Sequence, residues 1–498
     1  MPYILALDQG TTSSRSLIFD HQGRIIATAQ KEFKQNFPKP GFVEQDPIEI
    51  WTSQLSTIIE VLAKAKLTSQ DIQAIGITNQ RETTIIWDKK TGVPIHPAIV
   101  WQDRRTADFC EKLKNEGKNE QIHQQTGLLI DPYFSATKIN WILKNVPGSY
   151  EKAKKGELIF GTVDSWLIYQ LTNKKEHVTD PSNASRTMLY DLKKNCFVES
   201  LCSIFDVPMQ MLPNVLPSAG FFGYTDLQIF PTPIPITGVA GDQQAALFGQ
   251  GCFEKGTIKT TYGTGCFILM NLGSEILYSK HDMLTTIAWQ IGDKITYALE
   301  GSVFVGGAAV GWVKDNLGII KKASEIETLA ASVESTEGVL FIPALTGLGS
   351  PHWDPKAKGA IFGITRGTKA AHIALATLQG IAFSVFDVID SMKNDCSIPL
   401  KTMRVDGKVT RSDLLLQFQA DLLQITIEKP PSTEMTALGA ALLAGLGVGI
   451  FSSLDEMKSF SQIEKRFTPN KKLKHEELKK RYHKAIELIK ELEKNDES

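Results

Sequence analysis

The chain has 498 residues, of which 42% are hydrophobic and 22% are charged, with 38 glycines and 22 prolines. This length exceeds what one hydrophobic core usually organises, so we expect two large domains. The formal net charge of −1 gives no reason to expect nucleic acid or an anionic membrane as a partner.

The sequence does not predict export or membrane insertion. The first eight residues have no basic region and no long apolar core, so we do not expect a signal peptide. The least polar stretch, Ala437 to Ile450, is too short to span a bilayer and is rich in Gly and Ala, which predicts a closely packed buried helix. The six cysteines lack CxxC or Cys/His spacing, which favours reduced thiols in a cytoplasmic protein without a structural metal.

The predicted elements begin with two strand-like runs, Tyr3 to Leu7 and Ser16 to Phe19, on either side of a polar turn that contains glycine. This pattern is typical of a β-hairpin. Apolar residues at helical spacing predict a helix over residues 48–64, and strand-like runs follow at 74–78 and 83–87. Strands and helices interleave throughout, which indicates an α/β protein.

A second strand–turn–strand unit, Ile258 to Met270, resembles the first and suggests an internal duplication. We predict an N-terminal domain over residues 1–250, a C-terminal domain over 251–455 and a charged helical extension over 456–498. The extension carries one apolar stripe at helical spacing. We interpret it as a surface helix that packs on its own domain, with a partner-binding helix as the alternative.

The first turn carries residues that can bind a phosphate. Glycine allows positive φ, so that successive N–H groups can converge on an anion. The turn continues with hydroxyl and guanidinium donors, namely Thr11, Thr12, Ser13 and Arg15. Asp8 closes the preceding strand, where its carboxylate can hold Mg²⁺ directly or through water. Alone, these residues fit an ordinary hairpin turn equally well.

The second turn, Thr261 to Gly265, offers another set of backbone and hydroxyl donors, Thr264 among them. Two such turns predict a polyphosphate held between the two domains. The glycine spacing matches neither the Walker P-loop nor the dinucleotide fingerprint.

A candidate base, Asp242, follows the apolar run Ile234 to Val239 and precedes an Ala-rich helical segment. Ligands in α/β folds bind at the ends of strands. Phosphoryl transfer to an alcohol needs only a carboxylate that orients the hydroxyl and accepts its proton late. Helix N-capping also explains an Asp at this place and is compatible with the catalytic role.

The adjacent charges Arg81 and Glu82 come shortly after the strand-like run that ends at Thr78. Fixed donors and acceptors side by side match the hydroxyl groups of a polyol, although a surface ion pair is the simpler interpretation. Trp101 and Tyr133 can supply an apolar wall and a hydroxyl partner, or they can be core residues. Together with the two turns, these residues predict an ATP-dependent kinase of a small polyhydroxy substrate.

At these residues the sequence resembles the FGGY carbohydrate kinases. Tyr133 to Ile142 resembles the first family signature, and Gly359 to Ile364 with His372 to Gln379 resembles the second. The members that phosphorylate glycerol are the most similar, in stretches at 8–14, 75–84, 183–189, 241–249 and 261–267. The resemblance covers residues 3 to 455. Pentulose kinases of the family carry Met-His where this chain has Arg81 and Glu82.

The resemblance implies two actin-like, ribonuclease H-like domains with an ATP cleft between them, and Mg²⁺-dependent transfer from ATP to glycerol that yields sn-glycerol 3-phosphate. It implies that Asp242 is the base. The implied glycerol contacts are Arg81, Glu82, Trp101, Tyr133, Asp242, Gln243 and Phe267. The implied nucleotide contacts are Thr11, Thr12, Ser13, Arg15, Thr264, Gly307, Gly311, Lys408 and Ser412. It leaves a homo-oligomer open.

Two alternatives remain at this point. The first is a kinase of another short polyol or ketose, because fold and motif fix a reaction better than its substrate. The second is a non-catalytic, actin-like nucleotide-binding scaffold.

The chain departs from the better-studied bacterial members of the family where adenine and ribose are expected. Those members have Gln at the position of Gly311, Gly-Gly-Ala at Gly407 to Val409, and Asn at the position of Ser412. Nucleotide preference is therefore left open, with Lys408 either contacting a phosphate or crowding the adenine.

Two regulatory features of relatives are also missing. The stretch Pro231 to Pro233 lacks the arginine that binds fructose 1,6-bisphosphate in enteric members. No histidine lies between His177 and His281, where some Gram-positive members are phosphorylated. We expect no control by either route.

Overall fold

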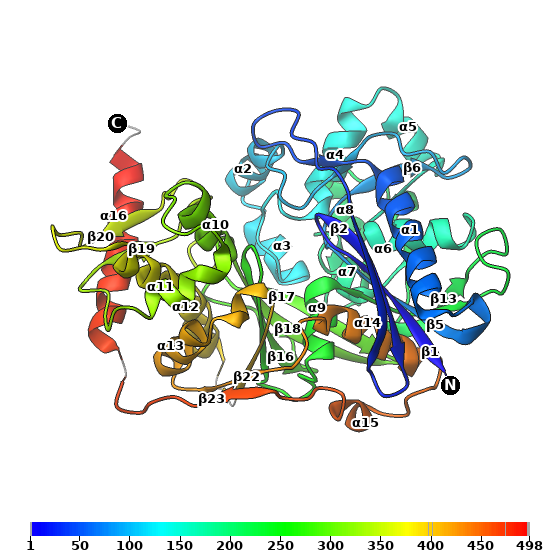
Figure 1. The fold of residues 1–498 in the computed structure, drawn as a ribbon. Helices are drawn as coiled ribbons and strands as arrows, with labels where there is room; N and C mark the ends of the chain where they lie inside the picture. The colour runs from blue at the N-terminus through cyan, green and yellow to red at the C-terminus, as the bar shows by residue number, and fades with distance from the viewer. Residues whose placement is uncertain (1, 397, 401, 474, 496–498) are drawn as a thin grey trace.

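The computed structural model describes residues 2–396, 398–400, 402–473 and 475–495. Within this part of the chain, thirteen strands form one sheet that runs through the whole molecule (Figure 1). In spatial order they are β23 (Lys465–Phe467), β22 (Thr426–Lys429), β21 (Thr402–Asp406), β15 (Ile258–Tyr262), β16 (Cys266–Gly273), β18 (Lys294–Val303), β17 (Leu284–Ile291), β13 (Ala219–Tyr224), β14 (Pro235–Gly241), β5 (Ile72–Asn79), β1 (Tyr3–Gln9), β2 (Ser13–Asp20) and β3 (Ile25–Glu32).

The sheet contains the same five-stranded unit twice. In the first unit, β1 pairs antiparallel with β2 and parallel with β5, while β3 and β14 extend the two sides. In the second, β15 pairs antiparallel with β16 and parallel with β21, while β18 and β22 extend the two sides in the same directions. This repeated order is that of a ribonuclease H-like unit, so the two predicted hairpins occupy equivalent places.

The remaining strands are short, and they pair outside the large sheet: β4 (Glu44–Gln45), β6 (Ile85–Asp88), β7 (Ala98–Ile99), β8 (Leu158–Gly161), β9 (Val178–Thr179), β10 (Tyr190–Asp191), β11 (Cys196–Phe197), β12 (Asn214–Val215), β19 (Leu340–Ile342) and β20 (Ala360–Phe362). The helices are α1 (Pro47–Ala65), α2 (Ala107–Asn115), α3 (Asn119–Thr126), α4 (Ser135–Asn145), α5 (Ser149–Lys154), α6 (Val163–Leu171), α7 (Pro181–Ala184), α8 (Glu199–Phe205), α9 (Asp242–Gly249), α10 (Gly307–Asp315), α11 (Ile326–Ala330), α12 (Ala370–Asp395), α13 (Asp413–Leu423), α14 (Met435–Gly447), α15 (Leu454–Lys458) and α16 (Glu476–Asn495).

Helix α1 lies where the sequence pattern predicts a helix, and capping residues define both of its ends. The Asp46 side chain accepts a hydrogen bond from the Ile48 backbone at 2.8 Å, and Pro47 stands at the first helical position. Lys66 ends the helix in the left-handed conformation. The buried face, which includes Ile50 and Ile58, packs on β2 and β3.

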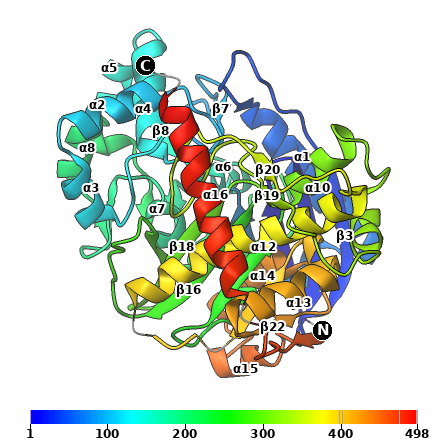
Figure 2. The ribbon, with the colours of Figure 1, turned by 90° about the vertical axis from the view of Figure 1, so that its left-hand side faces the viewer.

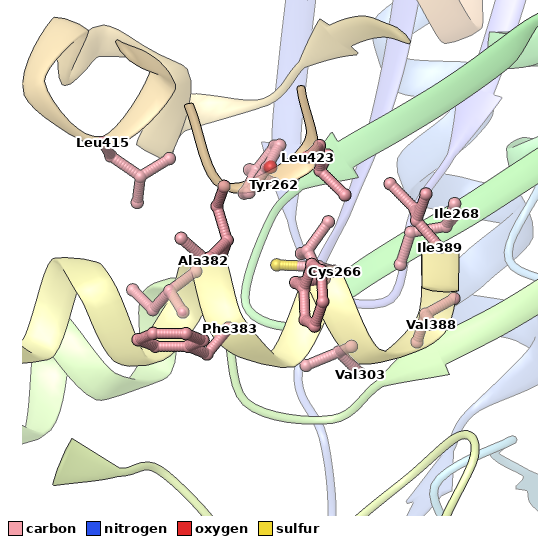
Figure 3. Close-up of a cluster of buried hydrophobic side chains, with 14 of the residues drawn as sticks. Tyr262, Cys266, Ile268, Val303, Ala382, Phe383, Val388, Ile389, Leu415 and Leu423 are labelled. Carbon is pink, nitrogen blue, oxygen red and sulfur yellow. The ribbon is translucent and has the colours of Figure 1, made fainter. Parts of the chain in front are cut away.

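Helix α12 forms the centre of the core of the C-terminal half, around which residues such as Tyr262, Cys266 and Val303 gather (Figure 3). It is the one helix in the described residues long and apolar enough to cross a membrane. Because 83% of its most apolar window is buried inside the protein, its composition reflects its place in this core.

Helix α14 confirms the expectation of a closely packed buried helix at Ala437 to Ile450. Although it comes late in the chain, it packs on β14, β5 and β1 and against α9 (Figure 1). The contact depends on glycine: a Cβ on Gly76 or on Gly439 would collide with a backbone oxygen, that of Ala440 or of Ala245 respectively. Helix α14 therefore joins the late part of the chain to the N-terminal sheet.

We predict that Gly439→Ala lowers the free energy of unfolding by about 3 kcal/mol, the upper end for overpacking, because backbone atoms of α9 cannot move aside. Urea unfolding of purified protein measures the loss. Gly311→Ala in α10 is the matched control, since a Cβ there meets no atom within 4 Å. An unchanged midpoint for Gly439→Ala would contradict the described packing.

Helix α16 crosses over α12 in Figure 2. Its Tyr482 ring stacks on Phe383 of α12 at 4.7 Å between centroids, and Ile486 and Ile489 are buried. The predicted stripe thus packs on the chain's own C-terminal half, except that Leu492 is exposed.

All six cysteines are free thiols, as expected from their spacing.

Candidate active site

The first turn joins β1 to β2 through residues 10–12, and glutamines fix its backbone. Gln45 and Gln35 donate to the Thr11 carbonyl at 2.8 and 3.1 Å. The Gly10 N–H donates to the Ser13 carbonyl at 3.0 Å. The expected positive φ is wrong for Gly10, which is not among the residues with positive φ. The Ser13 hydroxyl accepts from Gln30 at 3.0 Å, while the Thr12 side chain is exposed to a ligand.

Arg15 lies beside this turn and is held by carboxylates. Its Nη1 lies 3.4 Å from Asp8 Oδ2, and its Nη2 pairs with Glu434, which directly precedes α14. Burial raises the pKa of Asp8, and Arg15 counteracts this rise. A phosphate bound at this turn would therefore meet the Arg15 guanidinium, which two carboxylates already orient.

The second turn joins β15 to β16 through residues 263–265, and its glycines also lack positive φ; here Gly265 serves close approach. A Cβ on Gly265 would collide with the Val303 carbonyl. The Gly307 N–H at the start of α10 donates to the Gly263 carbonyl at 2.8 Å. The Thr264 side chain is exposed. The start of α10 and the second turn thus form one unit, which brings Thr264 and Gly307 close together.

Arg81 lies at the centre of a buried charge cluster, and is 2% exposed. Its guanidinium lies 3.3 Å from Asp242 Oδ1 through Nε, and its Nη2 donates to the Tyr133 hydroxyl at 3.2 Å. Its neighbour Glu82 is also buried and has a φ of 62°. A non-glycine residue in this region is strained, and such strain is common at functional sites. The interpretation as a surface ion pair is therefore wrong.

Asp242 is the first residue of α9, directly after β14. Gly241 holds the N-cap position, so the expected capping role for Asp242 is wrong; its Oδ1 accepts instead from the Gln243 N–H at 2.8 Å. The side chain is 31% exposed and can reach a substrate. Burial raises the pKa of Asp242, which Arg81 and Lys259 partly offset.

Aromatic rings bring the two turns together. Trp101 Nε1 donates to the Thr11 hydroxyl at 3.0 Å, and the Trp101 ring meets Tyr133 at 5.7 Å and Phe267 at 6.1 Å between centroids. Phe267 belongs to β16, directly after the second turn. The predicted apolar wall therefore lies between the first turn and the Arg81 cluster.

Three further charged residues reach this cluster and were missed from the sequence. Glu300 on β18 binds Arg81 Nη1 at 2.6 Å, and Arg186 Nε binds Glu82 at 2.6 Å. Lys259 on β15 donates to Gln243 at 2.5 Å, and burial lowers its pKa to about 8. One signal was available: Glu300 is the only charged residue in the strand-like run Ile295 to Val303.

The structure brings the residues predicted to contact adenine together less clearly than those predicted to contact glycerol. Ser412 uses its hydroxyl to cap α13, accepting from Leu415 at 3.2 Å. Lys408 is exposed, and Gly311 faces open space. A cavity of about 410 Å³ lies at the carboxyl ends of β21 and β22, but these three residues do not line it; its lining residues include Asp406, Thr410, Arg411, Lys429 and Glu434.

Metal binding by side chains alone is not supported in the described residues, where no group of three or more His, Cys, Asp or Glu residues could hold an ion. Asp8 and Asp242 are nevertheless close enough for the Asp8 charge to raise the pKa of Asp242. Mg²⁺ usually keeps several waters and takes one or two carboxylates together with substrate phosphates. The donor set therefore fits an ion that arrives with a nucleotide.

Sequence models of the FGGY family of carbohydrate kinases match the chain twice, the N-terminal domain over residues 3–249 and the C-terminal domain over residues 258–448. The chain belongs to the FGGY family. The matched ranges separate where the second hairpin begins, and the predicted boundaries at 250/251 and 455/456 stay predictions.

Relatives of this FGGY kinase are similar over nearly their full length. Glycerol kinase of Burkholderia ambifaria (strain MC40-6) is 54% identical over 94% of both chains, and that of Paraburkholderia phytofirmans is 55% identical over 96% of this chain and 95% of the relative. The crystal structure of Plasmodium falciparum glycerol kinase with ADP matches with a TM-score of 0.91 and 38% identity over 98% of both chains.

A more distant structure shows the shared fold alone. The xylulose kinase from Lactobacillus acidophilus matches with a TM-score of 0.87 at 22% identity, over 99% of this chain and 98% of its own. Together with the repeated five-stranded unit, these likenesses confirm the predicted α/β fold of two actin-like domains.

Proposed function

We propose that this FGGY kinase transfers the γ-phosphoryl group of ATP to glycerol and forms sn-glycerol 3-phosphate. The observation that carries the proposal is the cluster of Arg81, Glu82, Tyr133 and Asp242, which lies against the aromatic wall beside the first turn. The similarity to glycerol kinases over at least 94% of the chain supports it.

Glycerol would bind with its hydroxyl groups on the charge cluster and its carbon side on the aromatic wall. Arg81 and Glu82 supply fixed donors and acceptors, and Trp101 and Phe267 supply apolar surface. Asp242 orients the attacking hydroxyl and accepts its proton late in the transfer. Its partial exposure and its place at the end of β14 suit this role.

ATP would bind with its phosphates between the two turns. Thr12, Arg15 and Thr264 are placed to bind phosphate oxygens, and Gly307 lets α10 approach the second turn closely. Asp8 would hold Mg²⁺, which would neutralise developing charge on the phosphates. We propose that the adenine and ribose lie near Gly311, Lys408 and Ser412. Because there is open space at Gly311, the nucleotide preference has to be measured.

The six free thiols fit an enzyme of the cytoplasm, which we propose as its location.

The raised pKa of Asp242 predicts an acid limb in the activity. A base must be ionised, so kcat/KM should fall as the pH falls through a pKa above the ordinary value of 3.8. The pH profile of kcat/KM measures this, with circular dichroism at each pH to exclude unfolding. Full activity in folded protein down to pH 3.8 would contradict the assigned environment of Asp242.

ADP release by purified protein, with and without glycerol and with ATP, GTP or CTP, tests the proposed function. We expect turnover that depends on glycerol. Turnover that is indifferent to glycerol would reject it, and faster turnover with dihydroxyacetone or erythritol would favour the alternative substrate class. Nucleotide binding without turnover on any of these acceptors would favour a scaffold.

A further inference from the structure

Behind the residues that face the substrate lies a second pair of charges, Arg186 and Glu300, both fully buried. Arg186 follows α7 in the N-terminal half, and Glu300 lies on β18 in the C-terminal half. We propose that Arg186 and Glu300 are positioning residues for the acceptor, which fix the guanidinium of Arg81 and the carboxylate of Glu82. The inference rests on the proposed function and names the residues on which its acceptor specificity depends.

Glu300 fixes the plane of the Arg81 guanidinium. Its carboxylate accepts from Arg81 Nη1 at 2.6 Å and from Arg81 Nη2 at 2.9 Å. Such a bidentate pair sets direction as well as distance. In the resulting orientation Arg81 Nη2 also reaches the Tyr133 hydroxyl, and Nε points to Asp242. Arg81 and Glu82, called the acceptor clamp below, therefore depend for their orientation on residues that do not themselves face the substrate.

Arg186 holds the carboxylate of Glu82 in place. Its Nε donates to Glu82 Oε1 at 2.6 Å and its Nη2 donates to Glu300 Oε1 at 2.9 Å. Its guanidinium packs over the rings of Tyr133 and Phe134, at 5.5 and 5.2 Å from their centroids. A planar guanidinium can make these contacts together, whereas an ammonium group cannot. Arg186 thus joins Glu82, Glu300 and the Tyr133 ring in one rigid arrangement.

The charges in this layer balance, two arginines against two glutamates, and all four side chains are at most 2% exposed. Removal of one member leaves an uncompensated buried charge, so the remaining three must shift or admit water. Arg186 and Arg81 hold the pKa of Glu300 below its usual range despite its burial, which keeps it an acceptor for both. A displacement of the clamp by about 1 Å is enough to lower activity on the order of 100-fold.

The ion pairs of these four residues also connect the two halves of the chain. Arg81, Glu82 and Arg186 come from the N-terminal half, and only Glu300 comes from the C-terminal half, 219 residues beyond Arg81. The acceptor clamp is therefore complete only when β18 lies against the N-terminal residues. Acceptor affinity is accordingly coupled to the relative position of the two halves.

The test compares the full-length wild type with Glu300→Gln and Arg186→Lys. For each we measure kcat, KM for glycerol, KM for ATP, and discrimination against 1,2-propanediol, which lacks one terminal hydroxyl. We expect KM for glycerol to rise about 10- to 100-fold, with KM for ATP nearly unchanged. Discrimination against the diol should fall at least about 10-fold, because a displaced clamp no longer pairs with the third hydroxyl.

Further arms separate positioning from a merely structural role. Asp164→Asn is the matched control, since Asp164 is a buried carboxylate bonded to Thr162 and Thr179 and touches none of the four charges. It should leave KM and discrimination unchanged. The double variant of Glu300→Gln and Arg186→Lys should lose less than the sum of the single losses, because both act through one network. Should Glu300→Gln not fold, Arg186→Lys gives the same readout.

An active wild type whose variants keep KM for glycerol and discrimination within about twofold would overturn this inference alone, since about 10-fold is expected. A wild type whose turnover ignores glycerol would overturn the proposed function, and this inference with it.

Discussion

Asp242→Asn is expected to lower kcat with glycerol by about 1,000-fold, because a positioned general base contributes about 100- to 10,000-fold. The amide retains the shape of the side chain and can still accept from the Gln243 N–H, as Asp242 Oδ1 does at 2.8 Å. It cannot take the proton of the attacking hydroxyl. Steady-state kinetics give kcat, and isothermal titration gives nucleotide affinity, which should be nearly unchanged.

The control for this variant is Asp164→Asn, a buried carboxylate on α6 outside the cluster, which should keep kcat. Near-normal kcat in Asp242→Asn would reject the assigned base. Equal losses in both variants would point to general damage from removing a buried carboxylate.

Arg81→Met should have the second largest effect, on both acceptor binding and stability. It keeps much of the apolar stem but removes the partner of Glu300 and of Asp242. We expect KM for glycerol to rise about 100-fold. The free energy of unfolding should fall by about 3–5 kcal/mol, because a buried carboxylate is left unpaired. Steady-state kinetics and urea unfolding measure the two effects.

Arg24→Met is the comparison for stability. Its ion pair with Asp20 is largely exposed on the arginine side, 68%, and such pairs contribute about 0–1 kcal/mol. If Arg81→Met lost no more stability than Arg24→Met and kept its KM for glycerol, the buried cluster would not be the acceptor site.

Local patterns predicted the elements that hold the site. The two hairpins, helix α1, the buried helix α14 and the amphipathic α16 all have short-range signals, namely alternation, helical spacing or glycine content. Asp242 was placed correctly at the end of a strand for the same reason. The prediction of positive φ at Gly10 failed, and a Cβ there would meet only the Ser13 carbonyl oxygen, at 3.4 Å. At Gly265 of the second turn glycine serves close approach instead, which a sequence does not distinguish from a bent backbone.

Long-range pairing is what the sequence did not predict. Glu300 and Arg81 are 219 residues apart, and no local pattern in either segment indicates that they pair. Arg186 lay within a stretch similar to known kinases but had no assigned role, because its partners are distant in the sequence: Glu82 lies in the loop between β5 and β6, and Glu300 lies inside β18. The roles of Lys408 and Gly311 at the adenine remain predictions, since Lys408 is exposed and a Cβ on Gly311 would meet no atom within 4 Å.

The most direct test of the central claim follows the phosphoryl group itself. Purified protein is mixed with γ-³²P-labelled ATP and glycerol, and the labelled product is identified by its mobility and by a dehydrogenase specific for the sn-3 enantiomer. The account predicts that the label appears in sn-glycerol 3-phosphate and that Asp242→Asn lowers the rate of its formation by about 1,000-fold. Label found only in inorganic phosphate, or in neither product while ATP is bound, would contradict it.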